Sequence, residues 1–319
     1  MRFLIAMKTP ILLITFNRPD HTRRVLTEIL KQEPQSLYVC QDGAREGNEN
    51  DRIKCQEVRD VVKELTSAYK SSHEHFALHT LYQSKNLGCG PGPATGITWF
   101  FENVEMGIIM EDDCLPSDTL MAFEAELLEK YKDDERISII TGTNALSKWR
   151  SYKYGYIFSK SGGMTMGSWA SWRRVWKHFD WEIKSWGKQE TKERMRAIVG
   201  EKRYMELAPL YDKIYANPPR DAWDYQWAYA RTLLDSCSIV STVNQMSNIG
   251  FGVESTHTPN TNDRRGNMTV YTCHLPLRHH SFNIDRLFDW EMYQRFDRRT
   301  KKTSVMRLML KMVDLVCRR

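Results

Sequence analysis

Apolar runs alternate with amphipathic stretches over the first 140 residues, and this order constrains the fold more than any other feature of the sequence. The predicted strands are 10–16, 37–40, 76–82 and 106–110, and the predicted helices are 20–32, 51–67 and 97–103. Asp20 is the expected N-cap of the first helix, and a loop, NLGCGPGPATG, is expected to run into the last one. Alternating strands and helices predict an α/β, Rossmann-like fold, with a mostly parallel central sheet flanked by helices.

The pattern is less regular after residue 140, which predicts a second lobe of different construction. Strands are expected at 137–141 and 238–243, with a tryptophan-rich stretch and a helix at 222–234 between them. Five tryptophans are expected in the core, although one or two could line a sugar-binding groove: Trp169, Trp172, Trp176, Trp181 and Trp186. Since no Pro/Ser/Gly-rich linker interrupts the chain, residues 1–294 are expected to form one domain and 295–319 a tail.

The positive charge is concentrated in that tail. Residues 295–319 hold nine Lys and Arg against two Asp, so the other 294 residues carry a net −1 of the total +6. A body without net positive charge disfavours nucleic acid as a partner. In the tail, the polar residues Arg307, Lys311, Asp314 and Arg318 form one stripe of a helix, which predicts binding to an anionic membrane surface. Docking of this helix on the body or on a second subunit is the alternative.

Cysteine usage and the N-terminus predict a cytoplasmic protein, peripheral on the inner face of the plasma membrane through its tail. The seven cysteines are scattered and never spaced C-x-x-C, which is typical of a reducing compartment. Lys8 and Pro10 divide the apolar N-terminal residues into pieces too short to span a bilayer.

Polar clusters follow each of the four predicted strands. They are Asn17-Arg18, Asp42-Gly43, Lys85-Asn86 and Glu111-Asp112-Asp113, the last within GIIMEDDCLPSD. Because ligands of parallel sheets bind beyond the carboxyl ends of the strands, these clusters are expected to meet at one edge. Each has a plainer interpretation. The acids could be a solvated loop before a helix capped by Ser117, and Lys85 and Asn86 could only shape a turn.

Two sequence motifs that cradle phosphate with glycines, the Walker A pattern and the fingerprint G-x-G-x-x-G, are missing from the sequence. The nucleophile elbow G-x-S-x-G is missing too, so nothing supports a serine hydrolase. A diphosphate at this edge would therefore need a metal, and adjacent carboxylates suit Mg²⁺ or Mn²⁺. A nucleotide-diphospho-sugar fits, with the metal offsetting charge on the leaving diphosphate.

Five segments in order carry a family resemblance: PILLITFNRPDHTRRVLTEIL, YVCQDGARE, IIMEDDCLPSD, AWDYQW and SNIGFGVESTHT. From about residue 9 to residue 258, the chain resembles the nucleotide-diphospho-sugar transferases of GT-A fold, of the family 2-like kind. It is most similar to the inverting N-acetylglucosaminyltransferases of type I. The second lobe would then be the acceptor side.

The resemblance implies residue roles at the predicted edge. The donor-binding residues would be Asn17, Arg18, Asp42, Lys85, Asn86, Glu111 and Asp112. Asp42 would accept from uracil or ribose, and Asp113 would ligate Mn²⁺ or Mg²⁺. His257 would lie near the diphosphate as a second metal ligand, although a surface histidine is an equal alternative.

Asp224 in AWDYQW would be the general base. The family has two adjacent Asp before the Trp, whereas this chain has only Asp224 there, so Asp221 is the alternative base. Otherwise Asp221 would cap the helix expected at 222–234.

The predicted function is metal-dependent, inverting transfer of a sugar from a UDP-sugar to a hydroxyl of a glycan or glycolipid, in cell-surface polysaccharide synthesis. A sugar nucleotidyltransferase is the first alternative, but it would need a glycine-rich loop after the first strand, where this chain has Phe16-Asn17-Arg18-Pro19-Asp20. A non-catalytic sugar-binding protein is the second alternative.

Overall fold

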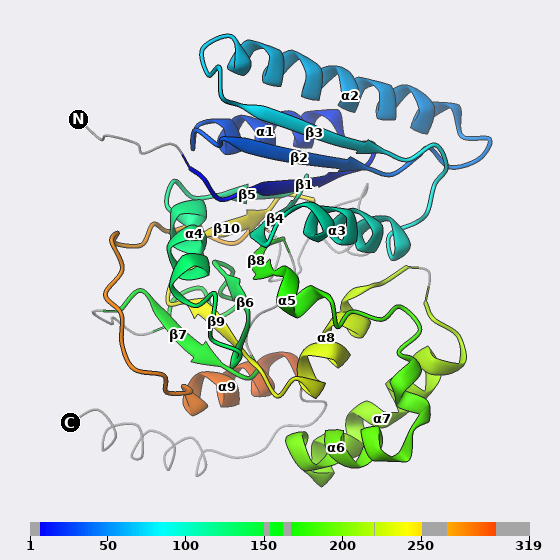
Figure 1. The fold of residues 1–319 in the computed structure, drawn as a ribbon, viewed down its shortest axis with the longest axis vertical. Coiled ribbons are helices and arrows are strands. Elements are labelled where there is room, and N and C mark those ends of the chain that lie inside the picture. The colour runs from blue at the N-terminus through cyan, green and yellow to red at the C-terminus, as the bar shows by residue number, and fades with distance from the viewer. Residues whose placement is uncertain (1–6, 150–153, 162–166, 220, 251–266, 298–319) are drawn as a thin grey trace.

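The computed structural model describes residues 7–149, 154–161, 167–219, 221–250 and 267–297. An eight-stranded sheet with the order β3-β2-β1-β4-β8-β6-β9-β7 forms its centre (Figure 1). The first half is parallel and consists of β1 (Ile11–Thr15), β2 (Ser36–Gln41), β3 (Ala77–Tyr82) and β4 (Met106–Glu111). The predicted mostly parallel, helix-flanked sheet is confirmed.

The second half of the sheet mixes directions. It consists of β6 (Ile137–Thr141), β7 (Tyr156–Ser159), β8 (Ser168–Trp172) and β9 (Cys237–Ser241). β8 is antiparallel to both β4 and β6, whereas β6 and β9 are parallel and β7 closes the edge antiparallel to β9. A separate two-stranded sheet pairs β5 (Cys114–Pro116) with β10 (Met246–Asn248).

Helices cover both faces of the parallel half. They are α1 (Pro19–Leu30), α2 (Glu49–Lys70) and α3 (Pro91–Asn103), and α4 (Leu120–Lys130) packs against β4, β6 and β8. Side chains alternate along β2: Tyr38 and Cys40 contact α3, whereas Gln41 donates to the Cys55 carbonyl of α2 at 2.8 Å. Therefore α2 and α3 lie on opposite faces of the sheet.

The structure corrects the predicted starts of α1, α3 and α4. α1 begins at Pro19 with Arg18 as N-cap, so Asp20 lies in the first turn and caps nothing. The N-cap of α4 is Thr119, and Ser117 lies two residues earlier in the turn. α3 begins at Pro91, so part of the predicted loop is helical. Residue 96 lies within that helix, and it is glycine because a β-carbon there would lie 2.6 Å from Cys40 Sγ.

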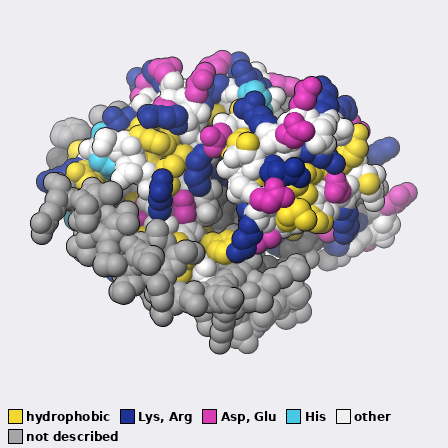
Figure 2. Space-filling model, turned by 90° about the horizontal axis from the view of Figure 1, so that it is seen from below, with side chains coloured by type: hydrophobic (Ala, Val, Ile, Leu, Met, Phe, Trp, Pro, Cys, Tyr) yellow, Lys and Arg dark blue, Asp and Glu magenta, His cyan; other side chains and the backbone are white. Residues whose placement is uncertain are grey.

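A small helical lobe follows β8 and the short α5 (Arg173–Trp176). It contains η1 (Lys184–Gly187), α6 (Gln189–Val199) and α7 (Glu201–Ala216), and leads into α8 (Asp224–Leu233). Its own apolar cluster surrounds the fully buried Trp186, apart from the main core. On the face in Figure 2, Lys and Arg are interspersed with Asp and Glu rather than gathered into one basic area.

The tryptophan prediction is confirmed in the main. Trp169, Trp172, Trp176 and Trp186 are buried, and Trp181 is half-buried against the main core. The chain then passes through α9 (Arg286–Met292) and η2 (Tyr293–Asp297), and η2 crosses the predicted boundary at residue 294. The rest of the tail lies outside the described residues. In the part of the chain that the structure describes, no helix is long and apolar enough to cross a membrane.

Candidate active site

The acid triplet stands where β4 ends beside β1. Glu111 is the last residue of β4, and the Asp112 N–H donates to the Ile14 carbonyl at 3.0 Å, which prolongs the β1–β4 pairing by one bond. Asp112 Oδ2 accepts from the Phe16 N–H at 3.3 Å, so this carboxylate turns toward the end of β1. The carboxylates therefore sit at the crevice between the two strands, as the strand pattern predicts.

Arg18 offsets the charge of the triplet. Its Nη1 lies 2.9 Å from Asp113 Oδ2 and 3.9 Å from Asp112 Oδ1. The guanidinium reaches the acids because Arg18 is the N-cap residue of α1, directly beyond β1. Its backbone carbonyl accepts from the Thr22 N–H at 2.9 Å, so the start of the helix does not depend on the side chain.

Burial and repulsion from neighbouring charges favour the protonated forms of Glu111 and Asp112. Burial, and then the charges of Asp113 and Asp112, raise the pKa of Glu111 well above its usual range. Burial and Asp113 raise the pKa of Asp112 to about 7, although Arg18 acts in the opposite direction. A cation beside Glu111 and Asp112 would stabilise their ionised forms.

Glu111, Asp113 and Cys114 can each offer one ligand atom to such a cation. These atoms lie within 4.8 Å of one another. Two carboxylates fit Mg²⁺ or Mn²⁺, which take few protein ligands and complete their shell with water or phosphate oxygens. The thiol of Cys114 donates to Asp113 Oδ1 at 3.1 Å and so also orients that carboxylate. The residues present fit a hard divalent cation with open positions.

The β5–β10 pair brings a distant segment to the acids. The Ile249 N–H donates to the Asp113 carbonyl at 2.8 Å, and Asn248 Nδ2 donates to Asp113 Oδ1 at 3.2 Å. The backbone of Gly250 then lies directly against the Asp113 carboxylate. His257, the predicted second ligand, lies outside the described residues.

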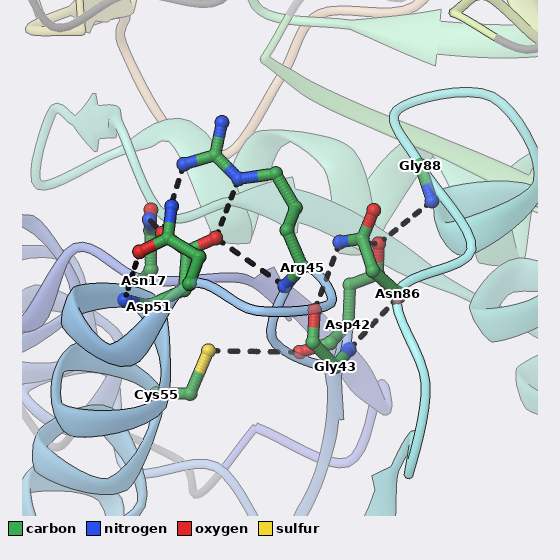
Figure 3. Close-up of polar contacts among 9 residues, drawn as sticks. Asn17, Asp42, Gly43, Arg45, Asp51, Cys55, Asn86 and Gly88 are labelled. Atoms are coloured by element: carbon green, nitrogen blue, oxygen red, sulfur yellow. Dashed lines mark hydrogen bonds and ion pairs between the residues drawn. The ribbon is translucent and has the colours of Figure 1, made fainter.

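The Asp42 carboxylate holds two loops together (Figure 3). It accepts from the N–H groups of Gly43, Leu87 and Gly88 at 2.8–2.9 Å, and from Asn86 Nδ2 at 3.0 Å. Four donors fill the acceptor sites of a carboxylate, so a nucleotide would have to displace one of them. Burial nevertheless raises the pKa of Asp42, against these hydrogen bonds.

Asn86 and Lys85 shape the turn beside Asp42. Asn86 Nδ2 also donates to the Gly43 carbonyl at 2.8 Å, and the Lys85 backbone comes so close that residue 43 has no room for a β-carbon. These contacts show that Asn86 shapes the turn, as one of the two interpretations of the sequence expects. Contacts of Lys85, Asn86 or Asp42 with a donor stay predictions.

A buried carboxylate that sequence reasoning missed supports the neighbouring loop. Asp51, with a side chain that is 0% exposed, accepts from Asn17 Nδ2 at 2.8 Å and from Arg45 Nη2 at 2.8 Å (Figure 3). Arg45, and then Asn17, lower the pKa of Asp51. Asn48 caps α2, because its side-chain oxygen accepts from the Asp51 N–H. A polar residue three positions before an acid is typical of a helix start, and this spacing could have located the start of α2 from the sequence.

The two candidate bases differ in their relation to the triplet. Asp224 lies in the first turn of α8, and its charge contributes to the raised pKa of Glu111, which places it within electrostatic range of the acids. Asp221 is exposed in a bend before the helix. Trp223 is the N-cap of α8, so the prediction that Asp221 caps this helix is wrong.

Comparisons with known proteins add little to this geometry. No family model and no curated protein matches the chain. Among solved structures, UDP-glucose pyrophosphorylase complexed with UDP-glucose is 9% identical, with 76% of this chain and 93% of that chain covered and a TM-score of 0.37. The 4-diphosphocytidyl-2C-methyl-D-erythritol synthase of Anaerococcus prevotii is also 9% identical, with coverages of 64% and 84% and a TM-score of 0.32. At such scores these likenesses assign neither an activity nor a substrate to this chain.

Proposed function

We propose that the protein is a metal-dependent, inverting glycosyltransferase of GT-A fold. It would move a sugar from a nucleotide-diphospho-sugar, a UDP-sugar, to a hydroxyl of a glycan or glycolipid in cell-surface polysaccharide synthesis. The observation that carries the proposal is the pairing of Arg18 with Asp113 and Asp112 at the carboxyl edge, next to a cluster that fits a divalent cation. The ordered sequence segments that resemble this family support it.

In this proposal, Glu111 and Asp113 hold Mn²⁺ or Mg²⁺, with His257 as a further candidate ligand. The metal, when bound, acts as a Lewis acid toward the leaving diphosphate. Arg18 supplies a second positive charge to the same diphosphate, and Asn17 fixes the loop beside it through Asp51. Asp112 is turned toward the Phe16 N–H and contacts the ribose or the sugar rather than the metal.

Asp224 is the proposed general base. Inverting transfer needs a carboxylate that takes the proton of the acceptor hydroxyl as its oxygen attacks the anomeric carbon. Asp224 comes from the helix that joins the two lobes, so it can face an acceptor while the β1–β4 edge holds the donor.

A sugar nucleotidyltransferase is less well supported, because Phe16, Asn17 and Arg18 connect β1 to α1 without a glycine.

One experiment separates glycosyl transfer from nucleotidyl transfer. The protein is screened by thermal shift against sugar nucleotides with and without Mn²⁺, since a ligand of the folded state raises its stability. The sugar nucleotide that raises the melting temperature most is then incubated with the protein and either glycan acceptors or diphosphate. Release of UDP with an acceptor supports glycosyl transfer. Formation of UTP from UDP-sugar and diphosphate would identify a nucleotidyltransferase and contradict the proposal.

The proposed organisation also includes a membrane-associated tail. Residues 295–319 would hold the 1–294 domain on the anionic inner face of the plasma membrane, near a lipid-linked acceptor. Liposome flotation of the full chain and of the 1–294 protein tests this, and equal binding by both removes the tail from the proposal.

A further inference from the structure

The guanidinium of Arg18 lies beside Asp113, where its positive charge would repel a metal ion bound to that carboxylate. Its Nη1 is 2.9 Å from Asp113 Oδ2, one of the carboxylates of the Glu111–Asp113–Cys114 cluster. Both side chains are largely enclosed, with Arg18 20% and Asp113 14% exposed. Among the described residues, Arg18 forms ion pairs with two members of the triplet, Asp113 and Asp112.

We propose that Arg18 makes cation binding at this cluster conditional on a nucleoside diphosphate. In the nucleotide-free protein, the guanidinium serves as the counter-charge of Asp113 and Asp112. When a diphosphate arrives, it pairs with Arg18 and offers oxygens to the cation, so the two ligands bind together. This inference rests on the proposed function, since it assumes that the cluster holds Mn²⁺ or Mg²⁺ beside a diphosphate.

Coulomb's law gives the size of the effect. A guanidinium and a divalent cation that both contact one carboxylate are separated by roughly 5 Å. Even with the dielectric constant of water, their repulsion weakens cation binding by about tenfold, and an enclosed site screens it less.

When a diphosphate is bound, Arg18 favours cation binding instead of opposing it. Its oxygens match the planar guanidinium and accept charge-assisted hydrogen bonds from it, so Arg18 no longer has to neutralise the acids. Because linkage is reciprocal, the factor by which UDP tightens Mn²⁺ binding equals the factor by which Mn²⁺ tightens UDP binding. Arg18 should account for a large share of that factor.

The side chain can be changed without removing the start of α1. Arg18 makes no side-chain cap bond, and its backbone carbonyl receives the Thr22 N–H whatever the side chain. Arg18→Gln removes the charge, and Arg18→Lys keeps it. Arg23→Gln is the matched control, because Arg23 lies on the same helix but pairs with Glu64 on the surface.

The experiment measures Mn²⁺ affinity by isothermal titration and by the electron paramagnetic resonance signal of free Mn²⁺, with no nucleotide, with UMP and with UDP. We expect the unmodified protein, Arg18→Lys and Arg23→Gln to bind Mn²⁺ weakly alone and much more tightly with UDP, and UMP to have little effect. In Arg18→Gln, Mn²⁺ alone should bind about tenfold more tightly, and the gain from UDP should shrink by a similar factor. Thermal unfolding of each variant checks its fold.

Two different failures are distinguishable. If Arg18→Gln binds Mn²⁺ alone no better than the unmodified protein and keeps the full gain from UDP, the coupling role of Arg18 is overturned while the metal site stands. If Mn²⁺ binds to none of these proteins even with UDP, or binds equally well to Asp113→Asn, the proposed metal site itself is wrong.

Discussion

The backbone of Gly250 lies against the side chain of Asp113 with no room for a methyl group between them. A β-carbon at residue 250 would overlap Oδ2 of that carboxylate. The glycine is therefore a steric requirement of the acid cluster, imposed from a segment 137 residues further along the chain.

Gly250→Ala should thus disturb Asp113 more than it disturbs the fold. The added methyl group pushes the carboxylate away from Arg18 and from the other candidate ligands, Glu111 and Cys114. We expect Mn²⁺ affinity measured with UDP to fall by about tenfold or more, with a small change in melting temperature. Asp118→Asn, which alters an exposed acid close in sequence, is the control and should leave Mn²⁺ affinity unchanged. Unaltered Mn²⁺ affinity in Gly250→Ala would contradict the steric dependence of the acid cluster on this glycine.

Asp224→Asn should slow transfer without weakening donor binding. A general base typically contributes about 10² to 10⁴-fold in rate, so kcat should fall by that factor while Mn²⁺ and donor affinity stay near those of the unmodified protein. Steady-state kinetics with the donor identified by thermal shift gives kcat, and titration gives the affinities.

Asp221→Asn is the matched variant for that experiment. Asp221 is exposed and does not cap α8, so we expect only a small effect on kcat. The roles are exchanged if Asp221→Asn loses transfer and Asp224→Asn keeps it. Full activity in both variants would exclude a base from this segment.

Asp51→Asn should loosen the loop that follows β2. The carboxylate holds Asn17 and Arg45 from a fully buried position, and an amide cannot accept from all of these donors at once. Hydrogen bonds of this kind to a charged group contribute roughly 2 kcal/mol, so we expect the free energy of unfolding to fall by about that amount in a urea titration. Asp60→Asn, on the exposed side of the same helix, should change it little. If the free energy of unfolding fell by the same amount in both variants, the hydrogen bonds of Asp51 would add no stability beyond that of an exposed acid.

Glu124 should make stability depend on pH. Its side chain is fully buried against Ser168 and the Gly142 N–H, and burial raises its pKa to about 8. The folded protein therefore keeps a proton that the unfolded chain releases above its own pKa of about 4.3. Between roughly these two pH values, the free energy of unfolding should fall as pH rises, by at most about 1.4 kcal/mol per pH unit from this group.

Glu124→Gln removes this term because an amide does not titrate and can still bond Ser168. We expect the variant to lose less stability than the unmodified protein between pH 5 and 8, as measured by urea unfolding at several pH values. Parallel pH curves for the two proteins would show that Glu124 is ionised in the folded state.

The half of the fold that brings the site together could be predicted from sequence, since its signals are local. β1, β2 and β4 are apolar runs followed by polar residues, whereas β3 is a more polar edge strand, and parallel strands bring the residues that follow them to one edge. The convergence of Arg18 with Asp112 and Asp113 follows directly from this rule.

The remainder depends on contacts between segments far apart in sequence. Nothing in SWASW reveals that β8 enters antiparallel between β4 and β6. The saturation of Asp42 arises only because the Leu87–Gly88 backbone folds back onto it, and Gly96 looks like a loop residue until its neighbour Cys40 is known. The burial of Asp51 likewise requires the helix start at Asn48, which the apolar pattern of α2 does not mark.

The two separate cores have an evolutionary consequence. The N-cap residue Trp223 and the α8 residue Trp227 pack in the main core, whereas Tyr229 of α8 packs in the apolar cluster around Trp186, so one helix contributes to both. Substitutions in α6 and α7 therefore change the smaller core without disturbing the packing that supports the sheet edge. In the proposed glycosyltransferase, the helical lobe could therefore change under selection while Asp224, in the first turn of α8, keeps its place relative to Glu111. Such an enzyme could acquire a new acceptor while it retains an old donor.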